Sequence, residues 1–362
     1  MKTERRVFVS DCEGPISKND NAYELTEHLV PQGDKLFARI SKYDDVLADV
    51  VERPDYKAGD TLRLIVPFLR AYGATNQELG RFSASNLLLV PSAGETLRFI
   101  KSMMPSFIVS TSYEQYMQAL CSATNFPYTN VYCTKLDIDR YRIDEEEIED
   151  LKQLGKEIVN MPMIQIPDEA RKLEDLSERD QRTIRRLDEI FWDEISQMES
   201  GRMLEEVNPV GGSQKADAVR DVVNRVKGTL SGIVYFGDSI TDVQCFQLVR
   251  EGGGLAVSFN GNRYAIREAE IAVLSDHTII LSILAEVFNR LGKQGVLHLV
   301  EDWGRSVLQK YCTPVLRRRL FTLYSGELPK LELIARNSRE ELMRESTAFR
   351  RTVRGEEIGE LG

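Results

Sequence analysis

One short stretch, Ile233 to Asp242, constrains the fold and chemistry of this chain more than any other. Its first part, Ile233 to Phe236, has the length and the β-branched and aromatic content of a buried strand. Gly237 lets the backbone turn off the end of that strand, and two carboxylates follow, Asp238 and Asp242. Open α/β sheets bind ligands where such strands end. Two acids held this close repel each other unless a cation or proton intervenes, so the stretch indicates either a divalent metal site or a solvated acidic loop.

A second strand near the N-terminus ends in the same way. Val7 to Val9 form an apolar run, and Asp11 and Glu13 follow almost directly. Because side chains alternate along extended backbone, these two carboxylates point the same way, whereas Cys12 between them points to the other side. Two strands of one chain thus end in paired acids, which favours the metal site over the solvated loop.

These two strand ends resemble the first and fourth motifs of the haloacid dehalogenase (HAD) superfamily of phosphatases and phosphotransferases. The first motif is an apolar strand followed by DxD, and the fourth is an apolar strand followed by GDxxxD, which Gly237 to Asp242 matches at every fixed position. Phe107 to Ser110 resembles the second motif, an apolar strand that ends in a hydroxyl, with Thr111 as the alternative hydroxyl. Lys215, which follows the glycine pair 211–212 at the start of a predicted helix, resembles the third-motif lysine. All four candidates occur in the family order.

The resemblance implies a phosphatase that works through an aspartyl-phosphate. Asp11 would attack phosphorus, and Glu13 would protonate the leaving alcohol and then deprotonate the hydrolytic water. Ser110, or Thr111 in its place, would donate a hydrogen bond to a phosphoryl oxygen, and Lys215 would offset the phosphoryl charge.

The same resemblance implies magnesium as the cofactor. Asp11, the backbone carbonyl of Glu13 and Asp238 would bind the ion, with Asp242 close by. Two residues depart from the family pattern, because Glu13 stands where most members have Asp and Pro15 where many have Thr. Some members similar to phosphoserine:homoserine phosphotransferase also carry D-x-E-G, so Glu13 is still expected to act as the acid and base.

The expected fold is α/β, a HAD-type, Rossmann-like parallel sheet flanked by helices. Three separated parts, residues 1–15, 90–136 and 207–290, would form the catalytic core. Residues 16–89 carry apolar side chains at helical spacing, and an all-helical insertion after the first motif resembles the cap of phosphoserine phosphatase-like members. Such a cap would close over the site, exclude water and select the substrate. The alternative is a helical subdomain that serves only stability.

Two further segments go beyond a minimal member of that group. Residues 137–206 contain 22 acidic and 11 basic residues, and from Ser177 on they have the apolar spacing of an amphipathic helix. This acidic helical insertion would form a second cap, an arm that docks a partner, or a solvated helical decoration. Residues 291–362 are also expected to be a helical extension, which would cover the core, form a homodimer contact or dock another protein.

Composition excludes several other classes of function. The net charge of −10 is concentrated in residues 137–206, and because no basic face dominates the rest, nucleic acid is not an expected partner. No apolar run reaches the roughly 18 residues that a membrane span needs.

The first strand begins within the first residues and leaves no room for a signal peptide, so a cytoplasmic location is expected. Five cysteines without metal-ligand spacing are expected to be reduced structural thiols.

The sequence therefore predicts a magnesium-dependent phosphatase that acts on a small phosphorylated metabolite. The alternative among enzymes is a phosphotransferase that passes the phosphoryl group to an acceptor alcohol. The alternative from another class is a non-catalytic HAD-fold subunit or regulator of a larger complex. It rests on a distant resemblance of the D-C-E-G-P motif and the extra helices to archaeal HAD-like proteins described as subunit R of energy-converting hydrogenase A. The complete set of motifs favours the enzyme.

Overall fold

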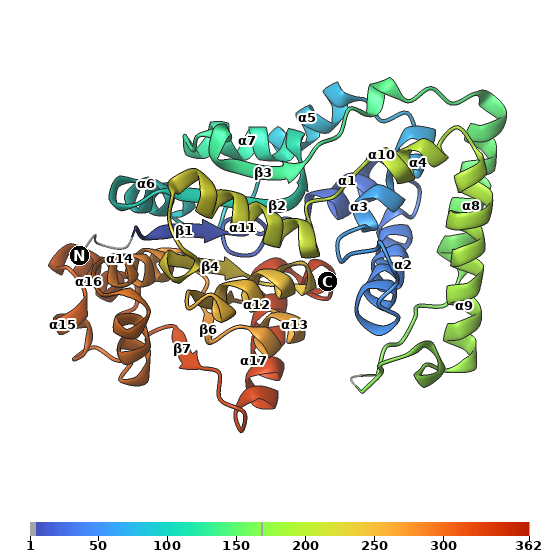
Figure 1. Cartoon of the computed structure of the whole chain (residues 1–362). Helices are drawn as coiled ribbons and strands as arrows, with labels where there is room; N and C mark the ends of the chain where they lie inside the picture. Colours follow the sequence, from blue (N-terminus) through green and yellow to red (C-terminus); the bar gives the residue numbers. More distant parts are fainter. Residues whose placement is uncertain (1–4, 168, 362) are drawn as a thin grey trace.

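The structure is a computed structural model and describes residues 5–167 and 169–361. In this part of the chain, a sheet of seven strands forms the centre of the molecule (Figure 1). The strands are β1 (Val7–Ser10), β2 (Ser106–Tyr113), β3 (Val131–Thr134), β4 (Ile233–Gly237), β5 (Leu255–Phe259), β6 (Ile271–Leu274) and β7 (Lys330–Leu333). Their order is β3-β2-β1-β4-β5-β6-β7, and all neighbours are parallel except β7, which is antiparallel to β6. The predicted parallel sheet is confirmed for β1 to β6, and β7 adds an antiparallel strand at its edge.

The order of the strands explains why two acidic strand ends meet. β1 pairs with β2 on one side and with β4 on the other, so that Phe8 lies opposite both Ser106 and Val234. The boundary between β1 and β4 is therefore a topological switch point, and open α/β sheets bind ligands beyond the carboxyl ends of the strands at such points. Asp11 and Asp238 are the first residues after β1 and β4.

A layer of helices covers each face of the sheet. Phe8 and Val234 pack into the hydrophobic cluster of one layer, and Val9 and Tyr235 pack into the cluster of the other. Because both faces are covered, these strands are continuous apolar runs rather than alternating ones. The first layer contains α6 (Ala93–Met103), α7 (Glu114–Thr124) and α14 (Ile279–Glu301), and the second contains α11 (Gly212–Val226) and α12 (Val243–Glu251).

Two helical segments that are far apart in the sequence form one body beside the sheet (Figure 1). Leu36 and Leu64 of residues 16–89 share a single hydrophobic cluster with Leu151 and Phe191 of the acidic insertion. The insertion is therefore packed against the helices that follow β1. The first segment contains α1 (Asn21–Leu29), α2 (Gly33–Asp45), α3 (Thr61–Leu64), α4 (Val66–Ala71) and α5 (Asn76–Ser85), and the second contains α8 (Glu145–Asn160), α9 (Glu178–Asp188) and α10 (Gly201–Glu206). We call this body the cap.

The prediction that residues 291–362 are helical throughout is wrong at β7. This strand reads K-L-E-L, in which Leu331 is buried and the charged side chains alternate with leucines, as at the edge of a sheet. The rest of the segment forms α15 (Leu308–Tyr311), α16 (Pro314–Leu323), α17 (Arg339–Arg354) and α18 (Glu356–Gly359). The last two helices return to the carboxyl edge of the sheet, where Ser346 donates a hydrogen bond to the carbonyl of Gly261 (2.6 Å). Figure 1 draws the C-terminus between the sheet and α2.

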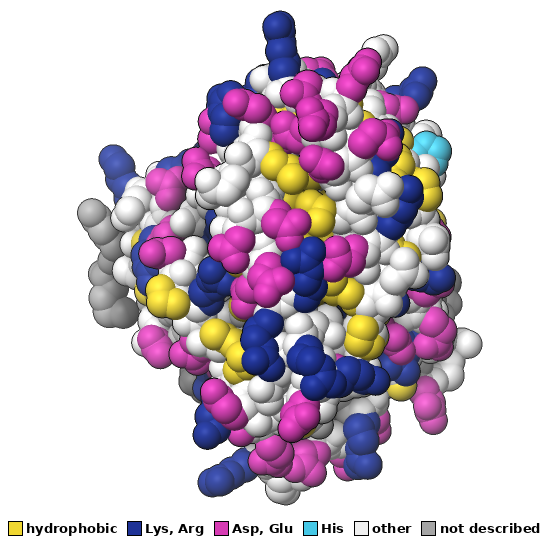
Figure 2. All heavy atoms as spheres, turned by 90° about the vertical axis from the view of Figure 1, so that its right-hand side faces the viewer, with side chains coloured by type: hydrophobic (Ala, Val, Ile, Leu, Met, Phe, Trp, Pro, Cys, Tyr) yellow, Lys and Arg dark blue, Asp and Glu magenta, His cyan; other side chains and the backbone are white. Residues whose placement is uncertain are grey.

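The surface that carries α8 and α9 is not uniformly acidic. Figure 2 shows acidic and basic side chains interleaved across this face. Exposed ion pairs account for part of the pattern, for example Arg186 with Glu157 (2.6 Å) and Lys152 with Glu149 (2.8 Å).

Two general expectations concern membranes and cysteines. None of the helices in the described ranges combines the length and the apolar character that crossing a membrane requires. All five cysteines are buried and free.

Candidate active site

Three buried carboxylates meet at the boundary between β1 and β4. The backbone amide of Asp11 donates to the carbonyl of Phe236 (2.7 Å), which extends the pairing of the two strands to their ends. The side chains of Asp11, Asp238 and Asp242 each bring one oxygen within 4.8 Å of the others. These residues are at most 5% exposed. The structure thus brings together Asp11 and Asp238, two of the predicted metal ligands, with Asp242, which was expected close by.

Lys215 joins two of these carboxylates. It lies in the first turn of α11 and is fully buried, and its Nζ donates to Asp11 Oδ2 (2.5 Å) and to Asp242 Oδ1 (2.7 Å). Burial by itself would lower the pKa of Lys215, but the two carboxylates raise it above the ordinary value, so the amine stays protonated. Burial raises the pKa of Asp11, and Lys215 acts in the opposite direction.

Both side-chain oxygens of Asp242 accept hydrogen bonds from neighbouring groups. Its Oδ1 accepts hydrogen bonds from Lys215 and from the Tyr235 hydroxyl (2.7 Å), and its Oδ2 accepts from the backbone amides of Asp238 (2.9 Å) and Ser239 (3.1 Å). A carboxylate with this many donors fits a positioning role better than direct metal ligation.

Two arginines from α17 contact Asp238, and sequence reasoning missed both. Arg350 and Arg354 each form an ion pair with Asp238 Oδ2, the second at 3.0 Å. Their side chains are only 3% and 5% exposed. One sequence signal could have found the first, because Leu342, Ser346 and Arg350 follow at four-residue steps on the buried face of α17. A cation on the packed stripe of a helix calls for a buried partner.

Gly14 brings the loop after β1 against Asp238. Its φ of +101° is a conformation that glycine adopts without strain. A Cβ at this position would lie 2.2 Å from Asp238 Oδ2, so only glycine fits. The first and fourth predicted motifs are therefore in direct contact.

Glu13 lies at the same edge and is half-buried. Its Oε1 accepts a hydrogen bond from the backbone amide of Asn21 at the start of α1 (2.8 Å). Burial in the site raises the pKa of Glu13 well above its ordinary value, and nearby Asp20 acts in the same direction. Glu13 can therefore hold a proton where ordinary glutamates are ionised.

The two candidate hydroxyls of the second motif have different surroundings. Ser110 Oγ is buried, shares a hydrogen bond with Ser112 Oγ (2.9 Å) and accepts from the Ser112 amide (3.2 Å). Thr111 lines the cavity described next, and its Oγ1 is buried without a hydrogen-bond partner among the described residues. The structure therefore places the alternative hydroxyl, Thr111, better for contact with a ligand.

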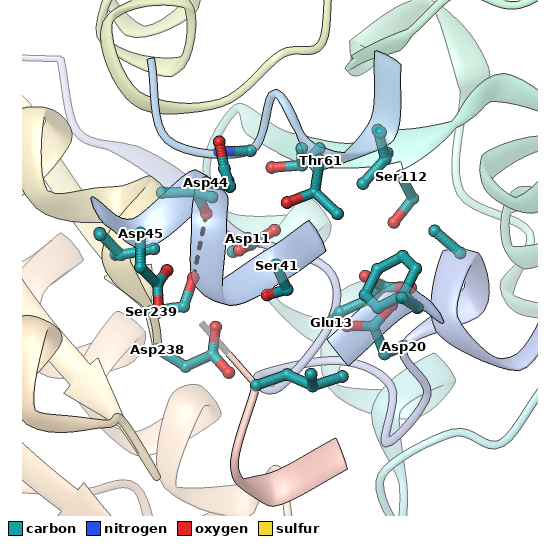
Figure 3. Close-up of a pocket in the computed structure, with 18 of the residues that line it drawn as sticks. Asp11, Glu13, Asp20, Ser41, Asp44, Asp45, Thr61, Ser112, Asp238 and Ser239 are labelled. Atoms are coloured by element: carbon teal, nitrogen blue, oxygen red, sulfur yellow. Dashed lines mark hydrogen bonds between the residues drawn. The ribbon is translucent and has the colours of Figure 1, made fainter. Parts of the chain in front are cut away.

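A cavity of about 90 Å³ lies between the sheet edge, the cap and the C-terminal segment (Figure 3). The cap lines it with Ser41, Asp44, Asp45 and Thr61, and the C-terminal segment contributes Arg350, Arg354 and Leu361. Asp44 Oδ2 accepts from the Gly59 amide (2.9 Å), and burial followed by the charge of Asp60 raises the pKa of Asp44 to about 7. The cap thus closes over the carboxylates and restricts the cavity to a small ligand.

The donor set fits a divalent cation. Asp11 and Asp238 offer carboxylate oxygens at one buried point, which is the ligand type that magnesium prefers. Both arginine contacts fall on Asp238 Oδ2, so they do not engage Oδ1. Lys215 and the arginines balance the charge of the three acids.

Comparison with solved structures shows a strong likeness over the whole chain. No family model and no curated protein matches the chain. Gene product AF1437 from Archaeoglobus fulgidus has a solved structure that is similar over 99% of both chains, with 26% sequence identity and a TM-score of 0.80. A HAD family hydrolase, t0658 from Salmonella enterica subsp. enterica serovar Typhi, covers 78% of this chain and 72% of its own, with 10% identity and a TM-score of 0.43, which does not establish a shared fold. The likeness to AF1437 includes the cap insertions and the C-terminal helices, so these belong to an architecture that the two chains share.

Proposed function

We propose that this chain is a magnesium-dependent phosphatase of the HAD type that hydrolyses a small phosphomonoester through an aspartyl-phosphate on Asp11. The observation that carries the proposal is the meeting of Asp11, Asp238 and Asp242 with the fully buried Lys215 at the β1–β4 switch point. These are the residues of three separate motifs, and phosphoryl transfer depends on positioning and charge compensation of this kind.

Asp11 is the nucleophile in this proposal. Its Oδ1 accepts from the Cys12 amide (2.6 Å) and its Oδ2 accepts from Lys215, so the carboxylate is held in one orientation. The charge of Lys215 opposes the effect of burial on the pKa of Asp11 and favours the ionised form that attacks phosphorus. Lys215 also offsets the charge of the phosphoryl oxygens. The hydroxyl of Thr111, which has no hydrogen-bond partner among the described residues, donates a hydrogen bond to one of them.

Glu13 is the acid and base. Its raised pKa keeps a proton on the carboxyl group, and Glu13 donates this proton to the leaving alcohol. The resulting carboxylate then takes a proton from the water that hydrolyses the aspartyl-phosphate. The amide of Asn21, at the start of the cap, holds this carboxyl group and couples its position to the cap.

Asp11, the backbone carbonyl of Glu13 and Asp238 would hold magnesium, with Asp242 positioning Asp238 and Lys215 around it. When bound, the ion supplies positive charge to the phosphoryl oxygens. The small volume of the cavity supports a small phosphorylated metabolite as the substrate.

Hydrolysis of p-nitrophenyl phosphate tests the proposal. We expect activity that needs magnesium, is abolished by a chelator, and falls by at least about three orders of magnitude in Asp11→Asn. Asp217→Asn is the control, because this exposed acid lies two residues after Lys215 and outside the site. Activity that survives Asp11→Asn, or no turnover on a broad panel of phosphomonoesters, would contradict the proposal.

A further inference from the structure

Arg350 has an unusual position for a residue of the C-terminal segment. It lies on the buried face of α17, lines the cavity and ion-pairs with Asp238, which is itself 1% exposed. Its Nε is buried without a hydrogen-bond partner among the described residues. Burying a guanidinium with an unused N–H donor costs free energy of folding unless an acceptor binds that donor.

Arg354, one turn further along α17, differs from Arg350 in this respect. Its Nε donates to the carbonyl of Lys18 (3.0 Å), another nitrogen donates to the carbonyl of Asn19, and Nη1 contacts Asp238. Arg354 is therefore anchored to the loop that leads into the cap. Arg350, by contrast, contacts only Asp238, through its carboxylate and its backbone carbonyl, in the hydrogen bonds that the structure describes.

The ion pairs at the sheet edge match three carboxylates with three cationic side chains before any ligand binds. Three carboxylates face three cationic side chains, which are Asp11, Asp238 and Asp242 with Lys215, Arg350 and Arg354. A divalent cation adds two positive charges, and the phosphoryl group of a monoester carries up to two negative charges. A cation on Asp238 also weakens the attraction between that carboxylate and Arg350, because the positive charges repel each other.

We propose that Arg350 is a substrate-binding residue that exchanges partners. It pairs with Asp238 in the free protein, and it donates to a phosphoryl oxygen of the substrate once a cation is held by the carboxylates. The inference rests on the proposed function and adds a phosphoryl-binding group from the far end of the chain. Arginine suits this role because its planar guanidinium can donate two hydrogen bonds to one phosphoryl group.

The proposal predicts opposite effects on two affinities. Without Arg350 the site carries one more negative charge, so it should bind a cation at least as tightly and an anion more weakly. A residue that only positioned Asp238 would instead lower the affinity for the cation when it is removed. Calorimetric titration with magnesium alone, and with inorganic phosphate at saturating magnesium, separates the two roles without any measurement of activity.

We expect Arg350→Ala to weaken phosphate binding by at least about tenfold and to leave magnesium affinity equal or higher. Arg344→Ala, on the exposed face of the same helix, should bind both like the unchanged protein. Arg350→Lys keeps the charge but loses the planar guanidinium. Its phosphate affinity should therefore lie between that of Arg350→Ala and that of the unchanged protein. This variant also provides the test if Arg350→Ala does not fold.

Three results would overturn the proposal. The first is a phosphate affinity of Arg350→Ala that equals that of the unchanged protein; if only Arg350→Lys folds, the same comparison is made with that variant. The second is a loss of magnesium affinity that parallels the loss of phosphate affinity. The third is no phosphate binding by the unchanged protein. Failure of the proposed function gives a different signature. Phosphate binding that depends on Arg350 in a protein that hydrolyses no phosphomonoester would refute hydrolysis and leave this role of Arg350 intact.

Discussion

Arg350 in α17 forms an ion pair with Asp238 at the end of β4, although 112 residues separate them in the sequence. The contact makes the last long helix part of the wall around the carboxylates. It also links the position of this helix to the geometry of the β1–β4 edge, because Asp238 touches both Gly14 and Arg350.

Gly14→Ala should disturb the site more than its backbone strain explains. The new Cβ would lie 2.2 Å from Asp238 Oδ2 and would displace this carboxylate. Gly73→Ala is the matched control, because Gly73 also has a positive φ, +83°, but has no atom within 4 Å of the added Cβ. We expect both variants to lose about 1–2 kcal/mol of unfolding free energy from the backbone alone. Gly14→Ala should lose a further 1–3 kcal/mol or so from overpacking, together with its activity.

Chemical denaturation and p-nitrophenyl phosphate hydrolysis measure the two effects. Equal losses of stability in the two glycine variants, or an unaltered activity in Gly14→Ala, would show that the described contact with Asp238 is absent.

Lys215→Met should destabilise the protein strongly. The substitution keeps much of the side-chain volume but leaves Asp11 and Asp242 without their shared cation in a buried place. Removing one partner from a buried ion pair costs about 3–5 kcal/mol. Arg220→Met on the same helix removes an exposed ion pair with Asp217 and should change the unfolding free energy by less than about 1 kcal/mol. Similar values for the two variants in urea titrations would contradict the buried arrangement.

Asp44 should make the stability of the protein fall as pH rises. Burial raises its folded-state pKa from 3.8 to about 7, so the folded state holds the proton more tightly than the unfolded state. The stabilisation from this group is full below about pH 4 and is lost as pH rises from there through 7, by an amount on the order of 4 kcal/mol. Asp44→Asn mimics the neutral acid and should lose less stability between pH 5 and pH 8. Parallel pH profiles of unfolding free energy for the two proteins would exclude this shift.

Leu151→Ala tests whether the acidic insertion belongs to the core of the cap. Leu151 of α8 is fully buried in the cluster that also contains Leu36 and Leu64. We expect a loss of about 2–5 kcal/mol in unfolding free energy, as for other buried leucines. Gln153→Ala, two residues away and exposed, should change the stability by no more than about 0.5 kcal/mol. A small effect at Leu151 would indicate an insertion that does not pack on the rest of the cap.

The sheet could be predicted from the sequence because its signals are local. Val7 to Val9 and Ile233 to Phe236 are short apolar runs that end in acids or glycine, and such runs specify buried parallel strands without information from elsewhere in the chain. The meeting of Asp11 with Asp238 then follows from the parallel direction of β1 and β4. β7 was missed because its four residues have only one buried leucine and two charged side chains.

The four-residue spacing on α17 could mark Arg350 as buried, but the partners of the C-terminal part of the site could not be predicted, because these contacts depend on tertiary packing. Arg350 and Arg354 lie on a helix with an ordinary amphipathic pattern, and only the docking of α17 decides which polar group they meet. The same holds for Thr111 and Ser110, since strand alternation distinguishes their faces but not the face that lines the cavity. The packing of residues 16–89 against residues 137–206 likewise depends on apolar faces whose partners are distant in the sequence.

The most direct measurement asks which residue carries the phosphoryl group during turnover. Protein mixed with p-nitrophenyl phosphate and magnesium is quenched in acid and reduced with borohydride, which converts an aspartyl-phosphate to homoserine. Peptide mass spectrometry then locates the modified residue. We predict homoserine in place of Asp11 and no modification in the Asp11→Asn variant. Turnover without modification of Asp11, or with modification of another acid, would contradict the assignment of Asp11 as the nucleophile.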